Sequence, residues 1–146
     1  MNKVLRYAII SGVFSIPFIV LIVSKSMFFP FITGKNFTFR IIVEIIFALW
    51  AILALRDPLF RPKFSWMLAA FASFVGIIAL ADIFGENPIR SFWSNYERME
   101  GLITLLHLLA YFIVLGSILQ TKILWQRLFQ TSLFVSLIVS LFNSST

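Results

Sequence analysis

The sequence Phe64-Ser-Trp-Met-Leu-Ala-Ala-Phe-Ala-Ser-Phe-Val-Gly-Ile-Ile-Ala-Leu-Ala81 contains no charged residue. As a helix rising 1.5 Å per residue, it is close to the length needed to cross a hydrocarbon core about 30 Å thick. A backbone surrounded by lipid must satisfy its own hydrogen bonds, and a helix does so within a single segment. The stretch therefore predicts a membrane-spanning helix.

Similar apolar stretches occur on both sides of this one. With it they predict five spans, at about 5–23, 37–55, 64–81, 102–119 and 124–142. The whole chain is 60% hydrophobic and only 12% charged, whereas soluble domains carry about 25% charged residues. We expect an all-α, polytopic membrane helical bundle that forms a single transmembrane region over residues 1–146. Pro17 is expected to kink the first helix, because proline removes a backbone donor.

Composition also excludes several classes of function. The chain has no cysteine, which removes disulfides, thiolate catalysis and cysteine metal sites. Its net charge of +6 comes from basic residues scattered singly between apolar runs, so we expect no nucleic-acid partner. No metal-binding cluster, glycine-rich phosphate loop or nucleophile elbow is present in the sequence, so we expect no metal and no cofactor.

The distribution of lysine and arginine predicts how the chain is oriented. Seven of these residues flank the N-terminus and the second and fourth loops, and five flank the first and third loops. Basic residues accumulate on the cytoplasmic side of membrane proteins. We therefore expect a cytoplasmic N-terminus and a polar loop at 82–101 on the outer side. The seven are Lys3, Arg6, Arg56, Arg61, Lys63, Lys122 and Arg127; the five are Lys25, Lys35, Arg40, Arg90 and Arg98.

The polar loop at 82–101 holds four of the six acidic residues in the chain and two arginines, Arg90 and Arg98. One hypothesis is that these arginines bind an anionic lipid or a sugar phosphate, because the planar guanidinium can contact two oxygens at once. The other is a surface helix whose charges are solvated and whose aromatic residues lie at the membrane interface. Those aromatic residues are Phe92, Trp93 and Tyr96.

A few polar residues fall inside or beside the predicted spans. Arg40 and Glu44 are four residues apart, which predicts a mutually neutralising pair on one helix face near the outer interface. A substrate-binding role for Arg40 is the alternative. His107 is interpreted as a hydrogen-bonded packing residue, with a proton relay as the alternative. Asp82 follows the third span directly, which favours a capping or solvated role.

The third span also carries small residues that would suit close helix packing. They are Ala69, Ala70, Ala72, Ser73 and Gly76.

Several segments together resemble a known family. They are Phe31-Ile-Thr-Gly-Lys-Asn-Phe-Thr-Phe-Arg40 with Glu44 and Trp50, Arg61-Pro-Lys-Phe-Ser-Trp66, Arg90-Ser-Phe-Trp-Ser-Asn-Tyr-Glu-Arg-Met-Glu-Gly101 and Leu105-Leu-His-Leu108. The chain resembles the N-terminal part of bacterial O-antigen ligase/polymerase-like membrane proteins over roughly residues 5–142. The most specific part of this likeness is Trp93–Gly101.

The resemblance implies a multi-pass protein of the bacterial inner (cytoplasmic) membrane that serves lipopolysaccharide biosynthesis in the cell envelope. Such glycosyltransferases move or polymerise glycans carried on a polyprenyl diphosphate at the outer face of that membrane. The family's catalytic arginines and histidine belong to a large periplasmic loop and to later spans, which this sequence does not contain. No catalytic residue is therefore transferred, and His107 is not equated with the family's histidine.

Two classes of function thus remain from the sequence. The first is an N-terminal fragment of an O-antigen ligase-like enzyme, the front part of a larger bundle, with polyprenyl-diphosphate-linked glycan and the lipid bilayer as partners. The second is a non-enzymatic membrane protein, such as a small transporter subunit or an assembly module. Transporters place polar groups in the middle of their helices. The sequence alone places only His107 well inside a span.

Overall fold

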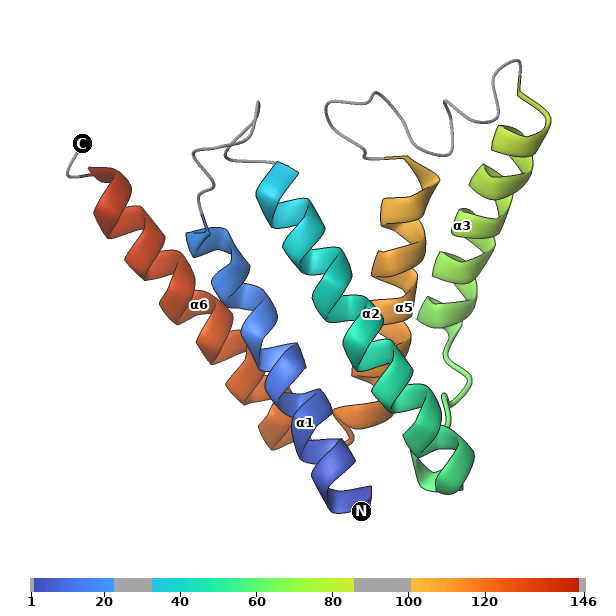
Figure 1. The fold of residues 1–146 in the computed structure, drawn as a ribbon, viewed down its shortest axis with the longest axis horizontal. Helices are drawn as coiled ribbons and strands as arrows, with labels where there is room; N and C mark the ends of the chain where they lie inside the picture. The colour runs from blue at the N-terminus through green and yellow to red at the C-terminus, as the bar shows by residue number, and fades with distance from the viewer. Residues whose placement is uncertain (1, 23–32, 86–100, 145–146) are drawn as a thin grey trace.

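The computed structural model describes residues 2–22, 33–85 and 101–144 (Figure 1). These residues are almost entirely helical, and no strand occurs among them. The elements are α1 (Asn2–Ser15), η1 (Ile16–Leu21), α2 (Thr33–Arg56), η2 (Pro58–Phe60), α3 (Trp66–Ile83), α5 (Leu102–Ile118) and α6 (Lys122–Ser144), where η denotes a 3₁₀ helix.

The helical bundle predicted from the sequence is confirmed in its general form. Four helices are long and apolar enough to cross a membrane, namely Asn2–Leu21, Gly34–Arg56, Trp66–Ile83 and Lys122–Leu141. The fifth, α5, has 17 residues and so extends about 26 Å, slightly less than a typical hydrocarbon core. Figure 1 shows the long helices side by side in an up-and-down arrangement, in which α2 and α5 run in the same direction.

The first span changes its helix type near Pro17. The α-helical part ends at Ser15, and residues Ile16–Leu21 continue as a 3₁₀ helix with the proline in its first positions. Proline lacks the amide hydrogen that an α-helix would need here, and the first positions of a helix tolerate that loss. The expected kink at Pro17 is thus a switch from α to 3₁₀ geometry.

The core lies where α1, α2 and α5 meet. Ile9, Ile46, Leu53, Val114 and Ile118 are among its most buried side chains. Gly12 permits the close approach of α1 to α2, because a Cβ atom at this position would overlap Cγ2 of Ile46. Small residues at such crossings are a common means of packing helices in membranes.

Helix α3 is the least enclosed element of the bundle. It packs mainly on α5, where the rings of Phe71 and Phe112 meet edge to face at 5.8 Å, and Val75 is its one buried residue. The small-residue surface expected to pack closely is largely open, since Ala70, Ala72, Ser73 and Gly76 are exposed. Within the described residues this surface is thus left accessible, and α3 meets α5 through larger side chains.

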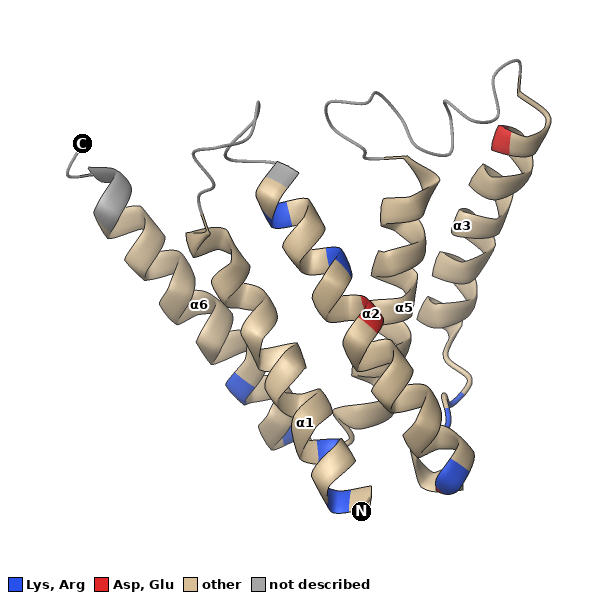
Figure 2. Ribbon diagram, in the orientation of Figure 1, with Lys and Arg blue, Asp and Glu red and all other residues tan. Residues whose placement is uncertain are grey.

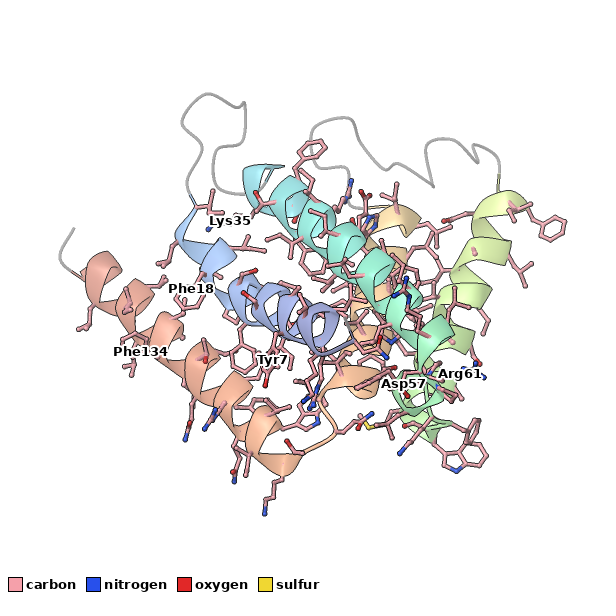
Figure 3. The ribbon with its side chains drawn as sticks, turned by 60° about the horizontal axis from the view of Figure 1, so that its bottom comes forward. Tyr7, Phe18, Lys35, Asp57, Arg61 and Phe134 are labelled. Atoms are coloured by element: carbon pink, nitrogen blue, oxygen red, sulfur yellow. The ribbon has the colours of Figure 1, made fainter. Side chains whose placement is uncertain are left out.

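Lysine and arginine residues collect at one end of the bundle, which we call the basic end (Figure 2). It contains the N-terminus and the turns that join α2 to α3 and α5 to α6. Figure 3 shows Asp57 and Arg61 in the first of these turns, with Lys35 near the other end of α2. The basic end is defined by Lys3, Arg6, Arg56, Arg61, Lys63, Lys122 and Arg127.

Hydrogen bonds hold the turn between α2 and α3 against the helices. The indole nitrogen of Trp50 donates to the carbonyl of Phe60 at 3.1 Å, and Nε of Arg61 donates to the carbonyl of Ala54 at 3.2 Å. The carboxylate of Asp57 accepts from the amide of Leu59 at 3.0 Å and so caps η2. This fixed turn sets where α3 begins.

Candidate functional site between α2 and α5

Two polar contacts join α2 to α5 inside the bundle. In the first, Nη2 of Arg40 donates a hydrogen bond to Oγ1 of Thr104 at 2.7 Å. Arg40 is only 7% exposed and is the one charged side chain that is buried among the described residues. A buried charge is costly in an apolar surrounding unless polar groups compensate it. The contact with Thr104 supplies part of that compensation.

The second contact lies one turn further along both helices. Nε2 of His107 is 3.1 Å from Oε1 of Glu44, and Nδ1 of the same ring is 2.6 Å from the carbonyl oxygen of Ile103. The carbonyl can only accept, so Nδ1 must carry a proton. Nε2 then faces a carboxylate, and this contact is a hydrogen bond only when a further proton lies between the two groups.

That shared proton determines the charge of the site. If it resides on the ring, the pair is an imidazolium and a carboxylate; if it resides on Glu44, both groups are neutral. The pair carries no net charge in either form. With that proton present, the four side chains Arg40, Glu44, Thr104 and His107 carry a net charge of +1, which comes from the Arg40 guanidinium. We call these four residues the α2–α5 polar site.

The geometry corrects the expectation that Arg40 and Glu44 neutralise each other near the outer interface. Each side chain instead contacts α5, Arg40 at Thr104 and Glu44 at His107. Glu44 is the twelfth of the 24 residues of α2, so it lies at the middle of that helix rather than near its end. Ionisable groups at such depth are rare in membrane helices and usually serve a function.

Sequence reasoning interpreted His107 as a packing residue because its own helix offers no acid nearby. The acid comes from another helix, 63 positions earlier in the chain. A signal for this pairing exists in the spacing. Residues 40 and 44 are four apart and residues 104 and 107 are three apart, so each pair lies on one face of its helix. Because α2 and α5 run in the same direction, the two faces can meet in register.

A shallow groove of about 180 Å³ opens beside the polar site. Glu44 and His107 line it, with Val43, Phe47, Leu106 and Ala110 as its apolar walls. The side chain of Glu44 is 68% exposed, whereas that of His107 is 13% exposed. The carboxylate is thus the accessible member of the pair, and a molecule in the groove would meet it first.

The sequence also singled out Arg90, Arg98 and Asp82. Arg90 and Arg98 fall outside the described residues. Asp82 is in the last turn of α3 and is partly exposed, at the end of the bundle opposite the basic end (Figure 2). Within the described ranges, no three His, Asp or Glu side chains converge as metal ligands would. Compared with models of known families, with curated proteins and with solved structures, the chain gives no match in any of the three comparisons.

Proposed function

We propose that this chain is the membrane-embedded N-terminal part of an O-antigen ligase/polymerase-like glycosyltransferase. In this proposal it belongs to the bacterial inner membrane and handles glycans linked to polyprenyl diphosphate at the outer face. The chemical step would take place on segments of the whole enzyme outside this sequence. The bundle would provide part of the groove in which the lipid-linked substrate is held.

The single observation that carries this proposal is the buried guanidinium of Arg40, bonded to Thr104 between α2 and α5. Arginine suits a diphosphate because its planar guanidinium can form two parallel hydrogen bonds with one phosphate group. Arg40 is the eighth residue of α2 and lies toward the end of the bundle opposite the basic end. Its hydroxyl partner Thr104 is in the first turn of α5, three residues after the end of the Trp93–Gly101 segment that carries the most specific resemblance.

The proposed orientation rests on the basic end. Seven of the lysines and arginines in the described residues gather there, whereas Lys35 and Arg40 are the two described ones toward the other end. Under the positive-inside rule the basic end lies in the cytoplasm. Arg40 and Thr104 then lie toward the outer leaflet, where the proposed donor lipid would present its diphosphate.

A binding experiment tests the proposed function. The full chain in lipid nanodiscs is titrated with a short-chain polyprenyl diphosphate and, separately, with the corresponding polyprenol. We expect the diphosphate to bind and the alcohol to bind much more weakly. Replacing Arg40 with Gln should weaken diphosphate binding. Arg56→Gln is the matched control, because Arg56 is an exposed arginine at the other end of the same helix.

A non-enzymatic transporter subunit is the second candidate, and one observation favours it. Glu44 and His107 lie 3.1 Å apart in the middle of α2, where they could share a proton, and both line a groove. Proton-coupled transporters use such carboxylate and histidine pairs as relays. This candidate predicts proton flux across vesicles containing the chain, and the flux should be lost in Glu44→Gln. The enzyme candidate predicts no such flux.

Arg90 and Arg98 are proposed as further contacts to the diphosphate or its sugar. If they are, Arg90→Ala and Arg98→Ala in the full-length enzyme should each reduce glycan transfer. Normal transfer with both changes together would show that neither arginine is needed.

A further inference from the structure

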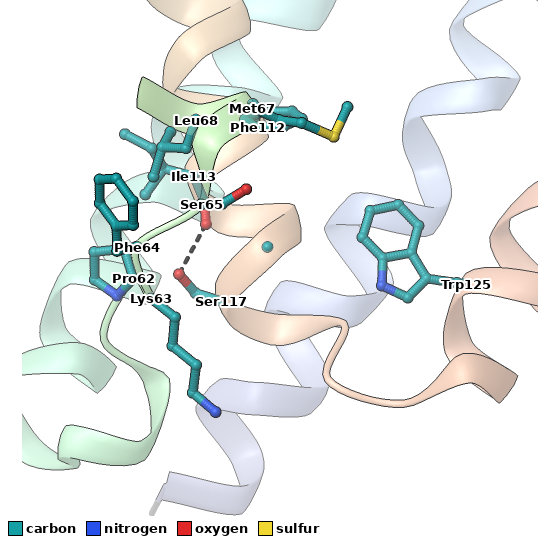
Figure 4. A pocket seen from close by; sticks show the side chains of 11 residues that line it. Pro62, Lys63, Phe64, Ser65, Met67, Leu68, Phe112, Ile113, Ser117 and Trp125 are labelled. Atoms are coloured by element: carbon teal, nitrogen blue, oxygen red, sulfur yellow. Dashed lines mark hydrogen bonds between the residues drawn. The ribbon is translucent and has the colours of Figure 1, made fainter. Parts of the chain in front are cut away.

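A second and larger cavity lies at the basic end, away from the α2–α5 polar site. It measures about 430 Å³, within the roughly 300–1,000 Å³ typical of sites for small ligands. The start of α3, the second half of α5 and Trp125 of α6 enclose it (Figure 4). Its walls are mainly apolar and include Phe64, Met67, Leu68, Phe112 and Ile113.

The polar groups of the cavity lie at one side. Figure 4 shows the side chain of Lys63 running away from the cavity toward the basic end. The hydroxyl of Ser117 is already bonded to the carbonyl of Ile113 at 2.8 Å, so it is not the principal polar contact for a ligand. Ser65 forms no capping bond through its side chain at the start of α3. An occupant would therefore meet an apolar slot and, next to it, a lysine among other basic residues.

Aromatic residues next to this cavity are of the kind found at the edge of a membrane. Trp66, the first residue of α3, is 82% exposed, and its ring packs edge to face with that of Phe64 at 5.5 Å. Tryptophan rings gather where hydrocarbon meets headgroups. With Trp66 at headgroup level, the slot lined by α3 and α5 would extend toward the hydrocarbon, as a lipid molecule does.

We propose that this cavity binds one acyl chain of an anionic phospholipid, with the phosphate of its headgroup at Lys63. Charge complementarity selects an anionic lipid over a zwitterionic one, because Arg61 and Lys63 lie in the same turn and the other residues of the basic end lie at the same end of the bundle. Basic pockets between membrane helices commonly hold anionic lipids in this way. The site is independent of the proposed glycan function, which concerns Arg40 toward the other end of the bundle.

Two glycines make the proposal testable with a matched pair of variants. Gly116 lines the cavity, and a Cβ atom built on it meets nothing within 4 Å. Gly116→Leu should therefore fill the slot without disturbing the helices. Gly76 on α3 has the same open surroundings but does not line the cavity. Gly76→Leu adds the same side chain elsewhere and is the control.

The experiment uses phosphatidylglycerol with a photoreactive group in its acyl chain, and the matching phosphatidylcholine. Each is present as a minor component of phosphatidylcholine nanodiscs that contain the full chain. After illumination, labelled peptides are identified by mass spectrometry. We expect phosphatidylglycerol to label segments 62–68 and 112–117 about fivefold more than phosphatidylcholine does, the preference that one lysine near a headgroup gives. Gly116→Leu should remove this labelling, and Gly76→Leu should retain it.

The headgroup contact is tested separately. Lys63→Gln should reduce the preference for phosphatidylglycerol, whereas Lys3→Gln, an equal charge change at the same end, should not. Equal labelling by the two lipids, or labelling that survives Gly116→Leu, would overturn the proposal. Circular dichroism of each variant verifies that the helices are intact. Because Arg40 is unchanged throughout, binding of polyprenyl diphosphate serves as an independent measure, so failure of one proposal leaves the other standing.

Discussion

Nε2 of His107 lies 3.1 Å from Oε1 of Glu44, and this contact joins two helices that lie next to each other in space but not in sequence. Helix α3 separates α2 from α5 along the chain. The other ring nitrogen, Nδ1, lies 2.6 Å from the carbonyl oxygen of Ile103, so both nitrogens of the ring have a partner. The ring of His107 is therefore held between its own helix and α2.

The protonation of His107 can be observed directly, since it is the only histidine in the chain. With ¹⁵N-labelled histidine, we expect NMR to show a proton on Nδ1 in the wild-type chain and in Glu44→Ala. The Nε2 signal should change in Glu44→Ala, because that nitrogen loses the carboxylate with which it shares a proton. An unprotonated Nδ1, or an Nε2 signal that is the same in Glu44→Ala as in the wild type, would contradict the two contacts of the His107 ring.

The energetic coupling of the pair is a second prediction. A double-mutant cycle with Glu44→Ala and His107→Ala should give a coupling free energy of about 0.6 kcal/mol and at most about 1.7 kcal/mol, the average and the maximum found for hydrogen bonds between membrane helices. Reversible unfolding in mixed micelles is the measurement. Additive effects of the two substitutions would mean that the contact does not stabilise the bundle.

The crossing of α1 and α2 should be sensitive to one added methyl group. Gly12→Ala places a Cβ against Cγ2 of the buried Ile46, and overpacking of this kind costs about 1–3 kcal/mol. Gly116→Ala is the comparison, because a Cβ atom at this position meets nothing within 4 Å. Alanine favours a helix over glycine by about 1 kcal/mol, so this variant should be more stable. Unfolding midpoints of the two variants should shift in opposite directions. A Gly12→Ala variant as stable as the wild type would show that the helices can move apart freely.

The hydrogen bond from Trp50 to the turn between α2 and α3 should contribute to the stability of the bundle. Trp50→Phe removes the indole donor to the carbonyl of Phe60, which we expect to lower the free energy of unfolding by about 0.5–1.5 kcal/mol. Trp66→Phe makes the same change at an exposed position and should have little effect. If both variants lost the same free energy of unfolding, the cause would be the smaller ring rather than the missing hydrogen bond.

The orientation can be tested with single cysteines, because the chain has none of its own. Thr121→Cys lies at the basic end, and Ser94→Cys lies in the polar loop at 82–101. A maleimide that cannot cross membranes should label Ser94→Cys in intact cells, and Thr121→Cys only after the membrane is permeabilised. The reverse pattern would place the N-terminus outside.

The sequence is sufficient to predict the apolar helices and their approximate limits, because hydrophobicity and length depend on local composition. It does not reveal which helix faces meet. Arg40 and Glu44 can pair along their own helix or reach another, and only the rotation of α2 against α5 decides between these arrangements. The small residues of α3 likewise permit close packing without requiring it. The matching spacings of 40 with 44 and 104 with 107 were the one local signal of the polar site.

Titration of a polyprenyl diphosphate against the full chain and against Arg40→Gln tests the central claim most directly. Hydrogen bonds to a charged group contribute about 1.5–3 kcal/mol, so the variant should bind the diphosphate at least about tenfold more weakly. Arg40→Lys should be intermediate, because it keeps the charge but loses the planar guanidinium. Arg56→Gln should bind like the wild type. Equal affinities for all four chains, or no binding by the wild type, would contradict the assignment of Arg40 to a lipid-diphosphate site.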